Sequence, residues 1–134
     1  MSLFEWQPIY SVGDADTDAQ HRQLFDIANR FERAYHEGSG TQQLFIIFSE
    51  LIDYTKVHFA DEERLMRQAG YPECDKHKEN HDRLVELVGA YCRSFERGDK
   101  DVAENAITFI KTWLTGHILG MDRKYRPYVD ETRH

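Results

Sequence analysis

The stretch from His58 to His81 constrains the fold of this chain more than any other feature of the sequence. Two pairs of potential metal ligands lie at its ends, His58 with Glu62 and His77 with His81. Each pair is spaced i, i+4, which on an α-helix puts both side chains on one face, about one turn apart. Residues 70–72 between the pairs read Gly-Tyr-Pro, a sequence that breaks helices. The stretch therefore predicts the end of one helix, a turn and the start of the next, with four ligands close together.

Hydrophobic periodicity predicts four helices in the chain as a whole. Apolar residues recur in alternating steps of three and four, as expected for the buried face of a helix, and Gly38 and Gly98 mark two of the breaks. Asp101 followed by Glu104 resembles a capping box at the start of the last helix. An N-terminal arm over residues 1–16 should fold its aromatic side chains back onto the domain, and a short tail should follow the last helix. The predicted helices cover about residues 18–37, 41–69, 75–97 and 101–119.

Four helices joined by short turns predict an all-α fold, an up-down-up-down four-helix bundle, in one domain over residues 1–134. Because chain direction alternates, the first and third helices start where the second and fourth helices end. Five histidines of the predicted buried faces fall at that same end, whereas His36 and His134 continue no buried face. Burying so many polar groups without partners would cost several kcal/mol, and metal ions would remove that cost by using their lone pairs. The five are His21, His58, His77, His81 and His117.

The ligand types indicate two metal ions. Histidine with carboxylate suits iron, zinc, manganese or copper, and five imidazoles exceed the four ligands of a tetrahedral zinc. Glu62 can bridge two metals, and Asp122 is the candidate for a second bridge. Asp122 follows His117 by five residues, about 140° off the helical face, so it reaches the site only if the helix widens or ends near Gly120. Seen alone, Asp122 would be a solvated acid near the C-terminus.

Two other metal motifs do not fit the spacing. The stretch from His77 to His81 differs from the zinc-protease motif HExxH, because its Glu79 stands one place too late. The ferritin type of di-iron site uses Glu-x-x-His pairs spaced i, i+3, whereas the pairs here are spaced i, i+4 and are rich in histidine. This mixture favours an O2-binding pair of irons over a carboxylate-rich oxidising pair.

Charge and composition exclude several classes of partner. The net charge of -7 argues against nucleic acid or an anionic membrane surface. No apolar run reaches the length of a membrane span, and residues 1–12 contain no signal peptide, so we expect a cytoplasmic protein. Cys74 and Cys92 lie on one predicted helix, about 27 Å apart, and are expected to be free thiols.

The order of the ligands resembles hemerythrin, specifically its single-domain bacterial form. The motifs D-x-x-H, H-x-x-x-E, H-x-x-x-H and H-x-x-x-x-D occur in that order, and the similarity covers nearly the whole chain, from Trp6 in the arm to Trp113 and Leu114. The acidic Asp14 and Asp16 depart from it, since relatives are often apolar there. The four motifs are Asp18 with His21, His58 with Glu62, His77 with His81, and His117 with Asp122.

The resemblance implies two non-heme iron ions. His77, His81 and His117 would hold one iron, and His21 and His58 would hold the other, which keeps an open position. Glu62 and Asp122 would bridge the irons together with a solvent-derived oxo or hydroxo group. The residues that match the apolar O2 pocket of the family are Leu24, Phe59, Trp113, Leu114 and Ile118.

Reversible O2 binding, for delivery, storage or sensing, is the function that this resemblance implies. We expect an O2-binding protein and not an enzyme, because no residue of the expected pocket is an evident acid or base. We also expect a monomer. O2 is the expected partner, and a protein that receives the O2 is a further candidate. The alternative is a di-iron enzyme that acts on nitric oxide, peroxide or ferrous iron.

Overall fold

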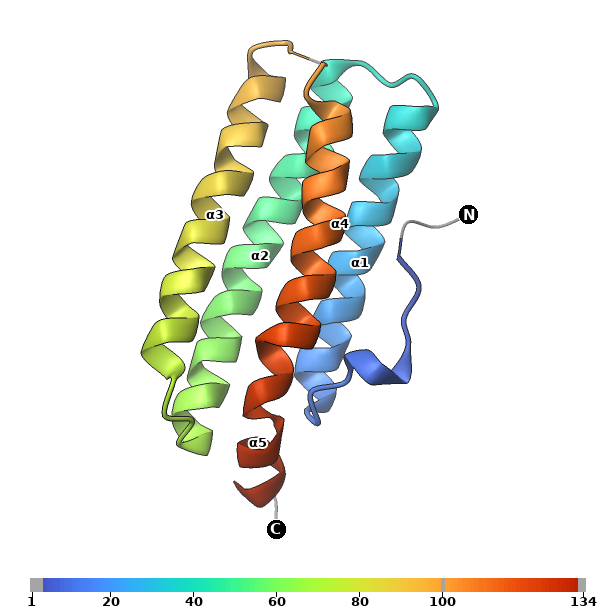
Figure 1. Ribbon diagram of the computed structural model, residues 1–134. Helices are drawn as coiled ribbons and strands as arrows, with labels where there is room; N and C mark the ends of the chain where they lie inside the picture. Colours follow the sequence, from blue (N-terminus) through green and yellow to red (C-terminus); the bar gives the residue numbers. More distant parts are fainter. Residues whose placement is uncertain (1–3, 100, 133–134) are drawn as a thin grey trace.

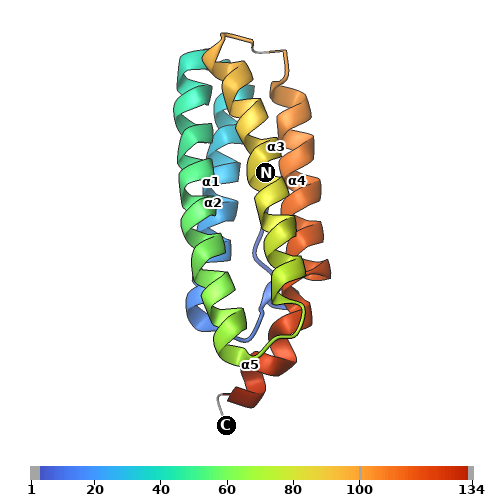
Figure 2. The ribbon, with the colours of Figure 1, turned by 90° about the vertical axis from the view of Figure 1, so that its left-hand side faces the viewer.

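Four long helices form an up-down-up-down bundle in the computed structural model, which describes residues 4–99 and 101–132 (Figures 1 and 2). They are α1 (Ala15–His36), α2 (Thr41–Ala69), α3 (Cys74–Glu96) and α4 (Ala103–Gly120). The described residues contain no strand. The prediction of an all-α four-helix bundle is therefore confirmed. None of the described helices has the length and apolar character needed to cross a membrane.

The turn between α2 and α3 is built as the sequence indicates. Gly70 adopts a left-handed conformation with φ of 73° after the last residue of α2, which glycine reaches without steric cost. The N–H of Tyr71 donates to the carbonyl of Met66 at 3.0 Å, as in a helix C-terminal cap. The chain then reverses and α3 begins at Cys74, so both ligand pairs lie close to the turn.

The start of α1 lies three residues before the predicted start at residue 18. Asp14 is the N-cap, and its Oδ2 accepts from the backbone N–H of Thr17 at 3.0 Å and from its hydroxyl at 2.7 Å. Asp18 instead lies inside the helix and binds the arm, since it accepts from the Ser11 hydroxyl and the Val12 N–H. Asp14, an acidic departure from the resemblance, therefore has a structural role as a buried cap.

The predicted capping box of the last long helix is not formed, and the predicted start at residue 101 is wrong by two residues. Val102 is the N-cap of α4 and its side chain makes no capping bond. Asp101 is exposed, and its backbone N–H donates to Asp99 Oδ1 at 3.1 Å. The preceding chain forms a turn here instead of an extended N-cap.

The C-terminal tail is helical. A 3-10 turn η2 (Asp122–Tyr125) follows α4 directly and leads into a short helix α5 (Arg126–Thr132). Pro127 lies in the first turn of α5, where its missing N–H costs nothing. Figure 1 shows α5 below α4 at the end of the bundle where α2 turns into α3.

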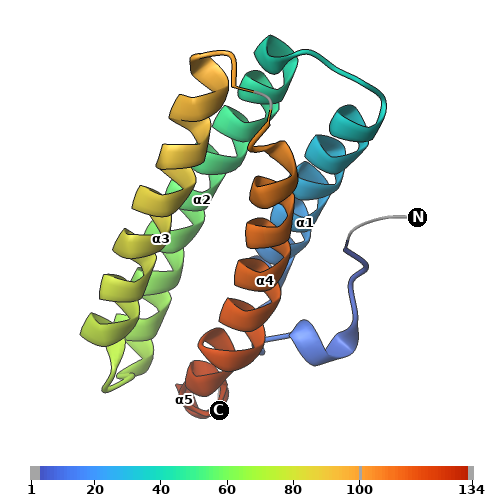
Figure 3. The same cartoon turned by 45° about the horizontal axis from the view of Figure 1, so that its top comes forward.

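The N-terminal arm packs on the outside of the bundle beside α1 and α4 (Figure 3). The ring of Phe4 stacks on Phe25 with centroids 4.7 Å apart. Asn29 binds the Phe4 backbone through both side-chain atoms, at 2.8 and 3.0 Å. Trp6 packs near Phe25 and carries the guanidinium of Arg22 on its outer face.

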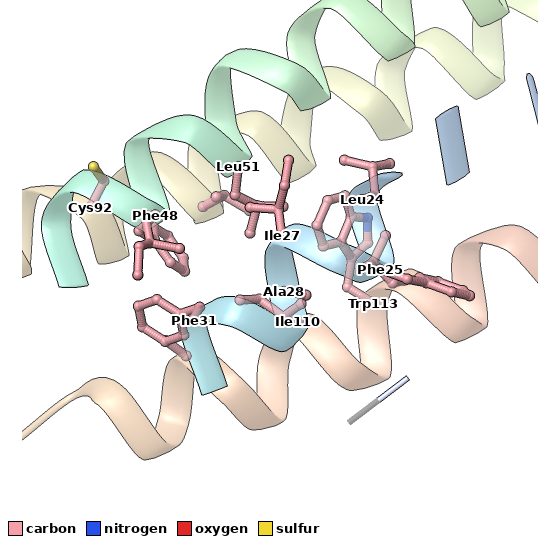
Figure 4. Close-up of a cluster of buried hydrophobic side chains, with 14 of the residues drawn as sticks. Leu24, Phe25, Ile27, Ala28, Phe31, Phe48, Leu51, Cys92, Ile110 and Trp113 are labelled. Atoms are coloured by element: carbon pink, nitrogen blue, oxygen red, sulfur yellow. The ribbon is translucent and has the colours of Figure 1, made fainter. Parts of the chain in front are cut away.

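Two apolar clusters bracket the histidine end of the bundle. The larger fills the interior between the long helices, where Figure 4 shows Phe31 and Phe48 towards one end and Leu24 and Trp113 towards the other. The smaller cluster closes the end of the bundle and joins the arm, the α2–α3 turn and the tail. Its buried members are Val12, Met66, Tyr71, Cys74, Tyr125 and Val129.

Candidate metal centre

Seven polar side chains from five elements converge in the interior at one end of the bundle. His21 comes from α1, and His117 from the last turn of α4. The remaining five come from the end of α2, the start of α3 and η2. Each of the seven is at most 6% exposed, so water does not satisfy them. The set is His21, His58, Glu62, His77, His81, His117 and Asp122.

The seven side chains form two groups with metal-ligand spacing. In each group one possible ligand atom per residue lies within 4.8 Å of all the others. The five-residue group contains His77, His81 and His117, and the four-residue group contains His21 and His58. Glu62 and Asp122 belong to both groups.

The two oxygens of Glu62 face different groups. Oε1 lies 3.3 Å from Nε2 of His77 and 3.0 Å from Nε2 of His81. Oε2 lies 3.4 Å from Nε2 of His21 and 3.5 Å from Nε2 of His58. The carboxylate thus offers one oxygen to each group.

Asp122 divides its oxygens in the same way. Oδ1 lies 2.9 Å from Nε2 of His77 and 3.0 Å from Nε2 of His117, whereas Oδ2 lies 3.1 Å from Nε2 of His21. Of the two possibilities that the sequence left open, the helix ends and does not widen: α4 stops at Gly120, and Asp122 starts the 3-10 turn that follows. Because α4 ends before Asp122, the chain leaves the path of the helix at Met121, and the offset of Asp122 from the histidine face along a continuous helix no longer applies.

The two carboxylates set the charge of the metal-free site. Burial opposes the charged form of His21 and His77, but the adjacent carboxylates of Asp122 and Glu62 raise the pKa of His21 to about 10 and of His77 to about 9. Burial lowers the pKa of His58. Although burial acts in the opposite sense, the surrounding histidines lower the pKa of both Glu62 and Asp122. The carboxylates are therefore ionised at neutral pH and attract cations.

The donor set fits metal ions better than it fits a hydrogen-bonded core. Most of the buried side-chain nitrogen and oxygen atoms without a hydrogen-bond partner in the described residues belong to this site. They include both oxygens of Asp122 and both ring nitrogens of His21 and His77. The Nε2 atoms of His81 and His117 lie 3.0 Å apart. Lone pairs that converge in this way are satisfied by a bound cation.

Three residues that support the site were not predicted from the sequence. Glu63 contacts Nδ1 of His81 at 2.9 Å, Gln20 contacts Nδ1 of His58 at 2.7 Å, and the hydroxyl of Tyr125 donates to Glu62 Oε2 at 2.9 Å. Gln20 and Glu63 stand next to ligands in the sequence, and that adjacency is the signal that could have suggested them. Tyr125 could not be placed, because it lies in the tail whose helical path the sequence did not indicate.

The five residues predicted to line an O2 pocket are all buried in the larger apolar cluster. Phe59 stacks on the ring of His81 with centroids 3.7 Å apart and meets Trp113 edge-on at 6.2 Å. Trp113 also lines, with His117, an open surface pocket of about 330 Å³ between α3 and α4. The apolar side chains therefore cover the metal site on its inner side. The remaining three are Leu24, Leu114 and Ile118.

Comparison with known proteins gives one consistent result. The family described as "Hemerythrin HHE cation binding domain" matches residues 12–129. A bacteriohemerythrin of Stenotrophomonas maltophilia is 34% identical over 96% of this chain and 83% of its own length. A bacteriohemerythrin of Methylococcus capsulatus is 30% identical over 95% of this chain and 97% of its own length.

Solved structures agree with the sequence comparison. A crystal structure of wild-type hemerythrin superposes with a TM-score of 0.87 at 29% identity, covering 96% of this chain and 98% of that chain. A crystal structure described as a hemerythrin L114A mutant superposes with a TM-score of 0.88 at 28% identity, covering 96% of this chain and 98% of that chain.

Proposed function

The chain belongs to the hemerythrin family, and from this premise we propose that it binds O2 reversibly at a non-heme di-iron centre. A hemerythrin domain implies non-heme iron, and the buried group of histidines and carboxylates is suited to metal. The observation that carries the proposal is the division of Glu62 and Asp122, each of which turns one oxygen to each histidine group.

Two irons would be held unequally. The five-residue group would hold one iron with His77, His81 and His117, and the four-residue group would hold the other with His21 and His58. Glu62 and Asp122, which belong to both groups, would help to hold both irons. Because the four-residue group supplies one imidazole fewer, a metal held there would be left with room for a small ligand such as O2. When bound, the reduced iron pair supplies the electrons and the vacant position that O2 binding needs.

The side chains around the site exclude water from it and hold their own protons. Phe59 and Trp113 cover the histidines with apolar rings, and the smaller apolar cluster closes the opposite side. The Tyr125 hydroxyl is committed to Glu62, and burial together with the Glu62 charge raises the pKa of Tyr125 further, so it holds its proton. Among the described residues, those that surround the site are apolar or hold their protons, which favours binding of a ligand over its turnover.

Reversible O2 binding is tested by an optical cycle. The iron-loaded protein is reduced without air, exposed to O2 and then flushed with argon, and the absorption spectrum is recorded at each stage. We expect a new visible band with O2 that disappears under argon and returns over repeated cycles. Consumption of O2 without a stable coloured form, or turnover of nitric oxide, peroxide or ferrous iron, would instead support the di-iron enzyme.

Leu114 is expected to protect the O2-bound protein from water. It is 3% exposed, lies in the larger apolar cluster with Phe59 and stands one turn before His117. A branched apolar side chain excludes water from the space beside the ligand, and Leu114→Ala opens that space. We expect the Leu114→Ala protein to release O2 faster. We also expect its iron to oxidise faster in air, and flushing with argon should not reverse that oxidation. Stopped-flow release and the oxidation rate measure the two effects.

Leu44→Ala is the matched control for Leu114→Ala. Leu44 is fully buried near the start of α2, at the opposite end of the bundle from the histidines. Either truncation should cost about 2–5 kcal/mol of folding free energy, but only Leu114→Ala should alter the O2 kinetics. Unchanged kinetics in a destabilised Leu114→Ala protein would assign Leu114 to the core alone.

A further inference from the structure

The two histidine groups differ in the side chain that contacts the outward-facing ring nitrogen of one of their histidines. One histidine of each group has a side-chain partner on the ring nitrogen Nδ1 that faces away from the bridging carboxylates. In the five-residue group Nδ1 of His81 meets Oε2 of Glu63 at 2.9 Å. In the four-residue group Nδ1 of His58 meets Oε1 of Gln20 at 2.7 Å. The Nδ1 atoms of the other three histidines have no hydrogen-bond partner among the described residues. Each group thus has one outer partner, an acid in one and an amide in the other.

The direction of both hydrogen bonds follows from metal binding. A metal uses the lone pair of Nε2, so the proton lies on Nδ1 and is donated outwards. Glu63 as a carboxylate can only accept it. The side-chain nitrogen of Gln20 donates to Oδ2 of Asp61 at 2.8 Å, which directs the amide oxygen towards His58. Both partners therefore fix the tautomer and the orientation of a ligand.

The charge behind the two histidines is not the same. The Glu63 side chain is only 12% exposed, and the ring of Phe59 lies against His81 on its face, so solvent screens this charge weakly. In the described part of the chain Glu63 pairs with His81 and with no lysine or arginine. The acid behind Gln20, Asp61, is 38% exposed and paired with Arg64 at 3.1 Å. The Lys78 ammonium also interacts with Glu63, but it is exposed and paired with Asp82. The negative charge behind His81 is therefore closer to its histidine, more buried and less screened than the charge behind Gln20.

We propose that Glu63 is a positioning residue that makes the five-residue group the more electron-rich metal position, with Gln20 as its neutral counterpart in the four-residue group. A carboxylate that accepts the Nδ1 proton makes His81 a stronger ligand. Oxidation of Fe²⁺ removes one electron and adds one positive charge, which the buried Glu63 carboxylate stabilises. Gln20 orients His58 without adding charge, so the metal position with fewer ligands keeps Fe²⁺ more readily. This inference rests on the proposed iron centre.

Two substitutions of equal size exchange the partners. Glu63→Gln removes the outer charge from His81. Gln20→Glu adds one behind His58, and it is made in an Asp61→Asn background so that the new carboxylate does not face the Asp61 carboxylate across the 2.8 Å contact. The midpoint potential is measured by anaerobic titration, in which a mediator takes one electron from each iron. We expect Glu63→Gln to raise the potential, Gln20→Glu to lower it, and the double exchange to lie between them. In competition with a chelator, Glu63→Gln should bind Fe²⁺ about 10–100-fold more weakly than the unaltered protein.

Opposite shifts distinguish this role from a merely structural one, which would leave the potentials of iron-loaded variants unchanged. Equal potentials in fully loaded variants, or shifts of the same sign, would overturn the inference. If Glu63→Gln did not take up iron, Gln20→Glu alone would decide, and an unchanged or raised potential there would overturn it. Failure of the unaltered protein to bind two irons would refute the proposed function instead, whereas loss of reversible O2 binding alone would leave the potentials interpretable.

Discussion

We expect that replacing Asp122 with alanine will lower the iron content of the purified protein from the proposed two per chain to one or none. Asp122 gives one oxygen to each group, at 2.9 Å from His77 and 3.1 Å from His21, so its loss weakens both metal positions together. The loss of affinity should exceed the roughly 10–100-fold cost of removing an outer hydrogen-bond partner. Iron analysis and the optical cycle measure the effect.

Two comparisons isolate the bridging role of Asp122. Asp82→Ala removes an exposed carboxylate of α3 that pairs with Lys78, and it should leave iron content unchanged. Glu62→Ala should also lose iron, and it should destabilise the protein further because it leaves the buried hydroxyl of Tyr125 without its acceptor. If Asp122→Ala kept two irons and normal O2 binding, Asp122 would not be the second bridge.

Removal of iron should lower the melting temperature by about 10–20 °C. A ligand present at about 1,000 times its dissociation constant stabilises the folded state by about 4 kcal/mol, and each kcal/mol shifts the melting temperature of a domain of this size by a few degrees. Without metal, the ligand atoms of the site are buried with only one another as neighbours, which two protonated histidines satisfy in part. Thermal unfolding of loaded and chelator-treated protein measures the difference, and equal melting temperatures would contradict this prediction.

The difference in stability should widen in alkaline solution. In the metal-free protein His21 and His77 take up protons beside the carboxylates, and their pKa values of about 10 and about 9 exceed the unfolded value near 6.5. Their contribution to the free energy of unfolding is fully present below pH 6.5 and is lost as the pH rises through 9 to 10. Bound metal replaces these protons, so the loaded protein should not share the loss. A metal-free protein that was equally stable at pH 6.5 and pH 10 would contradict the assignment.

The fold was predictable because its determinants are local. Apolar periodicity and the helix-breaking Gly70 and Pro72 act within a few residues, and they gave the four helices and the α2–α3 turn. The elements that the sequence misplaced depend on tertiary contacts. Asp14 caps α1, because the arm binds Asp18, and the buried Tyr125, which precedes α5 in η2, binds Glu62.

The residues of the candidate metal site could also be approached from the sequence, because alternating chain direction alone puts five histidines at one end of the bundle. Asp122 was harder, since its position depends on where α4 stops, and helix ends are set by packing as much as by sequence. Glu63 and Gln20 were missed because they point outwards from the ligand face, at the neighbouring histidine. Which side chains of two neighbouring helices meet depends on how the helices are rotated relative to each other, and the apolar periodicity of a single helix does not give that rotation.

The central claim, that two irons share Glu62 and Asp122, is tested most directly by the Mössbauer spectrum of the oxidised protein loaded with ⁵⁷Fe. We predict two irons per chain in equal amounts, in different ligand environments, whose spins are coupled so that the pair shows no magnetic splitting at low temperature and weak field. One iron per chain, or two irons that behave as magnetically isolated ions, would contradict the shared carboxylates and the function that rests on them.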